Sequence, residues 1–365
     1  MTTAQTGILA LEEMVDGLGP EERALCDRLF QISSVYGRLK PPEEMKAWIR
    51  NQFGSVEATL EQKVIKVTNQ VTLEGTLYNW LRSSRPMWRG SDINIAQELL
   101  DLGYDPLADP YTGTPEDEFG RVEGRYCVTA SNIAKFDGFH GLIVFNEKHP
   151  LKFDREQVRD YLETGELWAS RAHDADQSAM YYLFIWNCLW RAGASLLHGH
   201  AQVMLGRDLH YPAVERLRRA ALLYQAQFRA NYFSDLYTVH EALNCAFERD
   251  GVRFLASLTP VKENEVLIFA ESGTRTLADA IYDVLATLRD KLGVTSFNLA
   301  MYGPPLAETE EIWEGFPTVV RIVDRGDPKS RTADFAAMEI YAASVVSHDP
   351  LRLADLLRNE LAAQG

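Results

Sequence analysis

The sequence has few cysteines and no long apolar run. Its four cysteines stand singly, and none belongs to a Cys-x-x-Cys pair; they are Cys26, Cys127, Cys188 and Cys245. This spacing supports neither a disulfide framework nor a thiolate zinc site, so we predict no structural zinc. No stretch reaches the roughly 18 apolar residues of a membrane helix, and the first residues lack the basic start and apolar centre of a secretory signal. We therefore expect a cytoplasmic protein with no membrane partner.

An excess of basic residues is also missing. The net charge is −15 at pH 7, which argues against a general polyphosphate or nucleic-acid surface. Hydrophobic residues make up 46% of the 365 residues and aromatic residues 10%, enough to form a core and to make long disorder unexpected. Any anionic ligand would therefore have to be held by a few local donors.

The most informative segment is Ala194–Met204, where two histidines and a glutamine recur at a spacing of two. In a β-strand alternate side chains share a face, so His198, His200 and Gln202 would line one edge of a site. A histidine placed in this way can act as a nucleophile, and the amide can donate a hydrogen bond to a phosphoryl oxygen. On this segment alone, zinc chelation by His-x-His and a buried structural histidine pair remain open.

The motif resembles the active-site strand of the galactose-1-phosphate uridylyltransferases. These enzymes belong to the histidine-triad superfamily, together with the diadenosine tetraphosphate and ADP-sugar phosphorylases. The resemblance implies that the second histidine, His200, is the nucleophile that carries a nucleotidyl group. It also implies that a serine and an asparagine, three and eleven residues before the first histidine, contact phosphate; these offsets fall on Ser195 and Asn187.

A second similarity lies far upstream. Asn69–Thr72 is followed by Arg82 and Arg85, much as an Asn-Pro-Leu-Thr segment precedes Arg-x-x-Arg-Pro-Trp in the uridylyltransferases; here Met87 is inserted before Trp88. The resemblance implies that the two arginines bind substrate phosphates, for which the guanidinium fork is suited. Taken alone, the segment is more typical of a surface loop with two solvated arginines.

Two weaker similarities concern the base and the sugar. Asn132 precedes a predicted hairpin against which the nucleoside lies in histidine-triad proteins, but Ile133 follows it where uridylyltransferases commonly have an acidic residue. The base, whether uracil, adenine or guanine, therefore stays open. Glu339 resembles a glutamate that binds sugar hydroxyls, with a solvated helix glutamate as the alternative. We interpret the remaining histidines, including His140 and His149, as structural.

The resemblance and the pattern of elements predict an α+β fold that contains a tandem pair of histidine-triad units. We place an N-terminal helical extension at residues 1–60, the first unit at 61–211 and the second at 212–365. Within the two units we expect strands at 125–132, 141–146, 252–258, 265–269, 296–302 and 318–323, and helices at 154–173, 177–191, 212–232, 276–292 and 332–347.

These features together predict a nucleotidyltransferase that acts by double displacement through a nucleotidyl-histidine. It would move UMP, or another nucleoside monophosphate, between a nucleoside diphosphate sugar and a sugar 1-phosphate such as galactose 1-phosphate. The main alternative is a phosphorylase that splits a dinucleotide or nucleotide sugar with orthophosphate. A non-catalytic nucleotide- or metal-binding protein is a further alternative. We expect no nucleic-acid partner, and a homodimer is among the expected assemblies.

Overall fold

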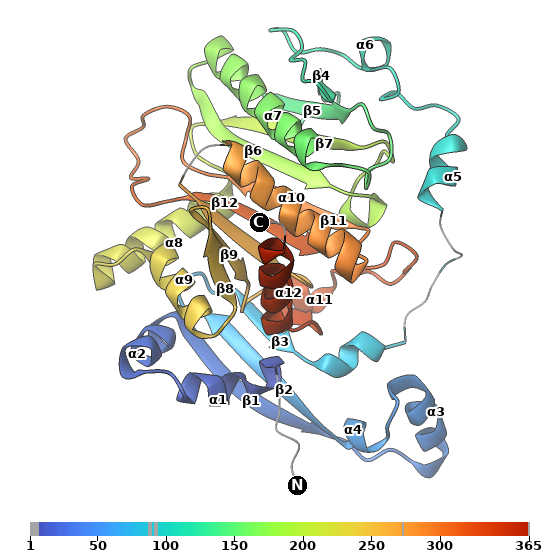
Figure 1. Ribbon diagram of the computed structural model, residues 1–365, viewed down its shortest axis with the longest axis vertical. Coiled ribbons are helices and arrows are strands. Elements are labelled where there is room, and N and C mark those ends of the chain that lie inside the picture. Colours follow the sequence, from blue (N-terminus) through green and yellow to red (C-terminus); the bar gives the residue numbers. More distant parts are fainter. Residues whose placement is uncertain (1–6, 87–89, 91–93, 272–273, 364–365) are drawn as a thin grey trace.

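The computed structural model describes residues 7–86, 90, 94–271 and 274–363. Two sheets form its frame (Figure 1). The larger has nine described strands in the order β4-β5-β7-β6-β11-β12-β10-β9-β8, and neighbouring strands run antiparallel. Their bounds are β4 Cys127–Ser131, β5 Phe139–Phe145, β6 Ala179–Asn187, β7 His200–Arg207, β8 Ala246–Arg249, β9 Val252–Ala256, β10 Val266–Ala270, β11 Phe297–Tyr302 and β12 Thr318–Asp324.

The large sheet contains the same arrangement twice. In the first unit, β4 and β5 precede helix α7 (Arg155–Ala175), and β6 and β7 follow it. In the second unit, β9 and β10 precede helix α10 (Thr274–Leu292), and β11 and β12 follow it. The strand order is reversed in the second unit, and β6 pairs with β11 where the units meet. The predicted α+β class and tandem duplication are therefore confirmed.

The main core lies between the large sheet and its helices. Helices α7 and α10 pack side by side across one face of the sheet (Figure 1), and helix α12 (Pro350–Ala362) packs against α10. Trp168 on α7 and Phe184 and Trp186 on β6 are among the largest fully buried side chains there. A second core lies on the opposite face, under β12, β10, β9 and β8. It is closed by helices α8 (Pro212–Phe228) and α9 (Tyr232–Ala242).

The N-terminal region completes this second core with a smaller sheet in the order β1-β2-β3-β13. Residues 7–60 are largely helical, as predicted, but Phe30–Arg38 forms strand β1, which pairs with β2 across the predicted boundary at residue 60. The domain boundaries themselves stay a prediction. The elements are η1 Gly7–Ala10, α1 Leu11–Asp16, α2 Pro20–Leu29, β1 Phe30–Arg38, α3 Glu43–Phe53, α4 Glu57–Leu60, β2 Glu61–Asn69, β3 Gly75–Tyr78 and β13 Ser344–Val346.

Two predicted helices are wrong. The apolar run at 177–191 forms strand β6, because it lies in the middle of the sheet and is apolar towards both faces, which hides a period of two. The segment 332–347 contains only the short helix α11 (Ala337–Tyr341) and strand β13, which pairs with β3. Tertiary pairing overrides local propensity there. The predicted helix at 212–232 ends early, at Phe228.

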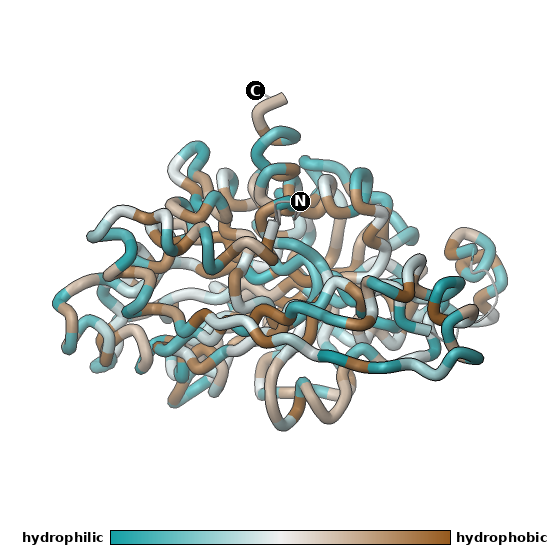
Figure 2. The backbone as a smooth tube through the Cα atoms, turned by 90° about the horizontal axis from the view of Figure 1, so that it is seen from below, coloured by the Kyte–Doolittle hydropathy of each residue, from teal (hydrophilic) through white to brown (hydrophobic). Residues whose placement is uncertain are grey.

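Short elements connect these layers: η2 Trp80–Ser84, α5 Ile95–Leu100, α6 Pro110–Gly113 and η3 Trp190–Ala192. Hydrophobic and hydrophilic residues are mixed along the whole described backbone, as Figure 2 shows. Among the described helices, none combines the length and the apolar character needed to cross a bilayer.

A charged cluster lies between the small sheet and the large one. Arg321 on β12 forms two hydrogen bonds with the carboxylate of Glu74, at 2.9 and 3.0 Å, and its Nη2 lies 3.4 Å from the buried Glu265. Burial raises the pKa of Glu265 to about 7, although the nearby guanidinium opposes this rise. The folded protein therefore holds a proton on Glu265 over a pH range in which the unfolded chain has lost it.

We expect Glu265→Gln to change how stability depends on pH. A raised carboxyl pKa makes Glu265 lower the free energy of unfolding as pH rises from about 4.5 to about 7. Across the whole pKa shift from 4.5 to about 7, the free energy of unfolding would fall by roughly 3 kcal/mol at most. Other groups titrate in the same window, so the quantity to measure is the difference between the urea-unfolding curves of wild type and Glu265→Gln. That difference should grow in favour of the variant as pH rises, whereas Glu248→Gln on the surface serves as the control. Parallel curves for wild type and Glu265→Gln would contradict the buried, protonated Glu265.

Candidate active site

The histidine motif enters the sheet at the start of β7. His198 and Gly199 precede the strand, and His200 is its first residue. Gly199 is required by close packing, because a Cβ atom there would lie 2.8 Å from the ring of Phe145 and 3.0 Å from the carbonyl oxygen of Glu147. The tight approach brings both histidines against the end of β5.

His200 is buried and has a defined tautomer. Its Nδ1 lies 2.7 Å from the backbone carbonyl oxygen of His198. A carbonyl oxygen only accepts hydrogen bonds, so Nδ1 carries the proton and Nε2 keeps its lone pair. Burial lowers the pKa of His200, which favours the neutral ring. No hydrogen bond to Nε2 occurs within the described chain, and this nitrogen has the properties of a nucleophile.

His198 is held through both of its ring nitrogens. Nδ1 lies 2.7 Å from a carboxylate oxygen of Asp105, and Nε2 lies 2.9 Å from the backbone oxygen of Phe145. Chelation of a metal by His198 and His200 would require one of these contacts to break. Asp105 was missed in the sequence. Its only local signal is an Asp-Pro turn, in which its other oxygen accepts from Leu107 N–H at 3.0 Å.

Gln202 follows on the same face of β7, and its amide is oriented by His140. The Nδ1 atom of His140 accepts a hydrogen bond from the backbone N–H of Phe136 at 2.9 Å, so Nε2 carries the proton. That proton is donated to Oε1 of Gln202 at 2.9 Å. The NH₂ group of Gln202 is therefore the end left to a ligand. His140 is structural, as interpreted, but its structural role serves the site.

Asn187 is the last residue of β6, and Asn132 directly follows β4. Ile185 pairs with Gln202 across β6 and β7, so the same register places Asn187 beside His200, with both side chains on one face. The amide nitrogen of Asn132 lies 3.2 Å from Nε2 of His140, a contact and not a hydrogen bond because Nε2 carries the proton donated to Gln202, and Oδ1 of Asn132 accepts from Ala134 N–H. Both asparagines are partly buried.

The remaining predicted residues are more scattered. Ser195 is exposed in the turn between η3 and β7. Arg82 and Arg85 line a groove of about 530 Å³ against α3, and none of the three motif residues lines it. Glu339 is partly buried on α11, where it accepts from the backbone N–H of Ala336 at 2.9 Å. The inserted Met87 and the neighbouring Trp88 lie outside the described residues.

The potential metal ligands of the chain are its cysteines and its His, Asp and Glu side chains. Each of the four cysteines is buried and free of a disulfide. Within residues 7–86, 90, 94–271 and 274–363, no three His, Cys, Asp or Glu side chains are grouped to hold an ion. The absence of a structural zinc stays a prediction.

Comparison with known proteins rests on structure. No protein-family model and no curated protein sequence matches this chain. ADP-glucose phosphorylase from Arabidopsis thaliana, solved with bound ADP-glucose, superposes with a TM-score of 0.61 at 16% identity, over 80% of this chain and 97% of that one. A uridylyltransferase superposes with a TM-score of 0.57 at 14% identity, over 82% of this chain and 99% of its own. A mutant uridylyltransferase superposes with a TM-score of 0.56 at 15% identity, over 70% of this chain and 98% of its own.

This protein therefore shares the fold of ADP-glucose phosphorylase and of the uridylyltransferases. The resemblance that the motifs indicate is confirmed at the level of fold.

We expect Asp105→Asn to lower the pKa of His200 further. The negative charge of Asp105 raises the pKa of His200 against the effect of burial, and its removal destabilises the imidazolium form. NMR titration of the histidine Cε1 protons measures this directly. Asp109→Asn, in the same loop but pointing to the N-terminus of α6, is the matched control and should leave the titration of His200 unchanged. An equal shift in both variants, or a wild-type pKa above 6.5, would contradict this account.

Proposed function

We propose that this protein is a nucleotidyltransferase that works by double displacement with His200 as the nucleophile. The observation that carries the proposal is the hydrogen bonding of His200 and Gln202. Nε2 of His200 has a free lone pair, because Nδ1 already donates to the carbonyl of His198. Beside it, the amide of Gln202 has its oxygen already engaged, so its NH₂ group is left to donate.

In the first step, Nε2 of His200 attacks the α-phosphorus of a nucleoside diphosphate donor. An N–P bond forms, the P–O bond to the leaving phosphate breaks, and that phosphate departs with the bonding electron pair. In the second step, an oxygen of the acceptor phosphate attacks the same phosphorus, and the N–P bond breaks. Proton transfer to the leaving phosphate is not required, because a phosphate leaves as a stabilised anion. Donors fixed in advance stabilise the charge on the phosphoryl oxygens.

The donors would be neutral amides and a hydroxyl near His200, together with the guanidinium groups of Arg82 and Arg85. Gln202, Asn187 and Ser195 would contact phosphoryl oxygens, while His198 would hold the position of His200 through its backbone. The first substrate class is a nucleotide sugar, such as a UDP-hexose, with a sugar 1-phosphate as acceptor. Glu339 and Asn132 would contact the sugar and the nucleoside.

A phosphorylase is the second candidate. The fold neighbour that was solved with bound ADP-glucose is such an enzyme, and orthophosphate would replace the sugar phosphate in the second step. The two functions share the nucleotidyl-enzyme and differ only in the acceptor. Supplying the labelled enzyme with orthophosphate or with galactose 1-phosphate separates them.

The test of the covalent step is intact-mass analysis after incubation with UDP-, ADP- and GDP-sugars. We expect a mass increase of one nucleoside monophosphate in wild type, because the intermediate waits for a phosphate acceptor. The increase should be absent in His200→Ala, and turnover should fall by about a thousandfold or more. His200→Gly should regain transfer with a nucleoside phosphoimidazolide, which supplies the missing ring.

Steady-state kinetics give an independent measure of the same mechanism. Double-reciprocal plots at several acceptor concentrations should be parallel, since the donor product leaves before the acceptor binds. Intersecting lines together with no mass increase from any donor would overturn the double displacement. Stoichiometric zinc that is lost in a His198/His200 double variant would instead favour a metal-binding protein.

We also expect Arg82→Lys and Arg85→Lys each to weaken transfer by roughly 1–3 kcal/mol in kcat/KM, because Lys keeps the charge but loses the bidentate fork. Neither guanidinium has a carboxylate partner within the described chain, which leaves both available to an anion in a protein of net charge −15. Arg38→Lys, at an exposed arginine that pairs with Glu61, is the control. Wild-type kinetics in the Lys and Ala variants of both arginines would refute a phosphate-binding role.

A further inference from the structure

Asn298 of the second unit contacts a predicted site residue of the first unit, Asn187. Asn298 on β11 pairs with Asn187 on β6, and its Nδ2 donates to Oδ1 of Asn187 at 2.6 Å. Paired residues of antiparallel strands present their side chains to the same face. His200, Asn187 and Asn298 therefore follow one another in a row across three strands, and the last of them belongs to the unit that lacks the His-x-His-x-Gln motif.

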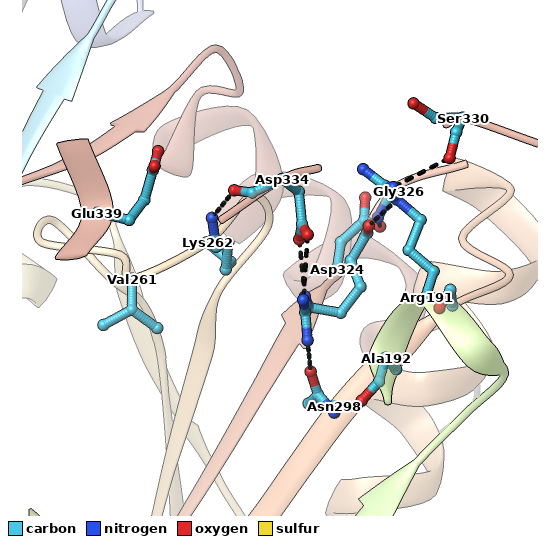
Figure 3. A network of polar contacts seen from close by, with 12 residues as sticks. Arg191, Ala192, Val261, Lys262, Asn298, Asp324, Gly326, Ser330, Asp334 and Glu339 are labelled. Carbon is cyan, nitrogen blue, oxygen red and sulfur yellow. Dashed lines mark hydrogen bonds and ion pairs between the residues drawn. The ribbon is translucent and has the colours of Figure 1, made fainter. Parts of the chain in front are cut away.

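The amide of Asn298 has only one possible orientation. Its Oδ1 accepts from Nη1 of Arg325, and its Nδ2 also donates to the backbone oxygen of Ala192 at 2.8 Å (Figure 3). An arginine can only donate and a carbonyl oxygen can only accept, so these two partners distinguish the oxygen of the amide from its nitrogen. Asn298 consequently offers a proton, and never an oxygen, to Asn187.

Arg325 is itself fixed at both ends. Its guanidinium donates to the two carboxylate oxygens of Asp334 at 2.8 and 3.1 Å, and its backbone oxygen accepts from Nε of Arg191 at 2.8 Å. Arg191 in turn donates to the backbone oxygen of Thr332 at 2.8 Å. Figure 3 shows this network between β11, β12 and the segment that leads to α11, where Lys262 also donates to the backbone oxygen of Asp334. A bidentate ion pair of this kind leaves the guanidinium little rotational freedom.

We propose that Asn298 and Arg325 are positioning residues, which turn the amide of Asn187 so that its NH₂ group faces the transferring phosphoryl group beside His200. Asn187 must present Oδ1 to Asn298, and no acceptor within the described residues binds its Nδ2. The inference rests on the proposed function and deepens it. It gives the unit that lacks the His-x-His-x-Gln motif a part in the chemistry, and it matches the way in which His140 orients Gln202.

Asn298→Asp is the discriminating variant. The new carboxylate keeps the contact with Arg325 but cannot donate, so Asn187 would turn its NH₂ group away from the phosphoryl group and its oxygen towards it. We expect the rate of nucleotidyl-enzyme formation to fall by about 10-fold to 100-fold, the scale of one hydrogen bond to a charged group. In an Asn187→Ala background the same change should have no further effect, because the amide that it turns is gone.

Arg325→Gln should lower the same rate, and Arg159→Gln is its matched control. Arg159 forms a bidentate pair with Asp279 at 2.6 and 2.7 Å, but it joins α7 to α10 on the other face of the sheet. Its loss should leave the rate of nucleotidyl transfer unchanged. An equal effect of Asn298→Asp with and without Asn187, or equal losses in Arg325→Gln and Arg159→Gln, would overturn the proposal.

A measurement without turnover separates this proposal from the proposed function. With ¹⁵N-labelled asparagine, the side-chain amide protons of Asn187 should exchange quickly with water in wild type and slowly in Asn298→Asp, where they bind the carboxylate. Asn187→Ala assigns the signal. If no donor labels the wild-type enzyme, the proposed function fails, yet the exchange rates still decide the orientation. Slow exchange for Asn187 in wild type would overturn the positioning role.

Discussion

The antiparallel pairing of β6 with β11 is the constraint on which the site and the second unit both depend. It joins the two units into one sheet and brings Asn298 to the side of Asn187, in line with His200. A slip of one residue in this register would put Asn187 and Asn298 on opposite faces of the sheet. The buried Phe184 and Trp186, which point to the face of β6 opposite Asn187, make such a slip costly because they fill the core under α7 and α10.

The candidate site around His200 consists of neutral groups inside an acidic protein. Burial disfavours the charged form of His200, and a backbone carbonyl selects the tautomer with a free Nε2. The oxygen atoms of Gln202 and Asn187 are engaged by His140 and Asn298, which leaves NH₂ groups as donors. Such donors are organised by folding itself, so they need no rearrangement when charge develops on a phosphoryl group. A basic surface is therefore not required for an anionic substrate.

The two units share a topology but differ in what they contribute. The first supplies the histidines at the start of β7, and the second supplies Asn298 and Arg325 at the ends of β11 and β12. Chemistry is a property of the residues at a site and not of the fold that carries them. The duplication thus gives the active unit a neighbour whose side chains meet it across the central strands.

The sequence by itself determined the local patterns. The period-two spacing predicted a shared face that the structure shows for His200 and Gln202 on β7, and the predicted bounds of α7 and α10 are right to within a few residues. It failed at β6 and in the segment 332–347, where a strand apolar on both faces and a set of tertiary contacts leave no periodic signal.

Only the tertiary structure decided which residues orient the site. Asp105 meets His198 across 93 residues, His140 meets Gln202 across 62, and Asn298 meets Asn187 across 111. No local pattern encodes such contacts, because a hydrogen bond depends on which strands become neighbours and in what register. A short motif can therefore indicate candidate reactive residues, whereas the residues that contact and orient them are known only once the sheet is assembled.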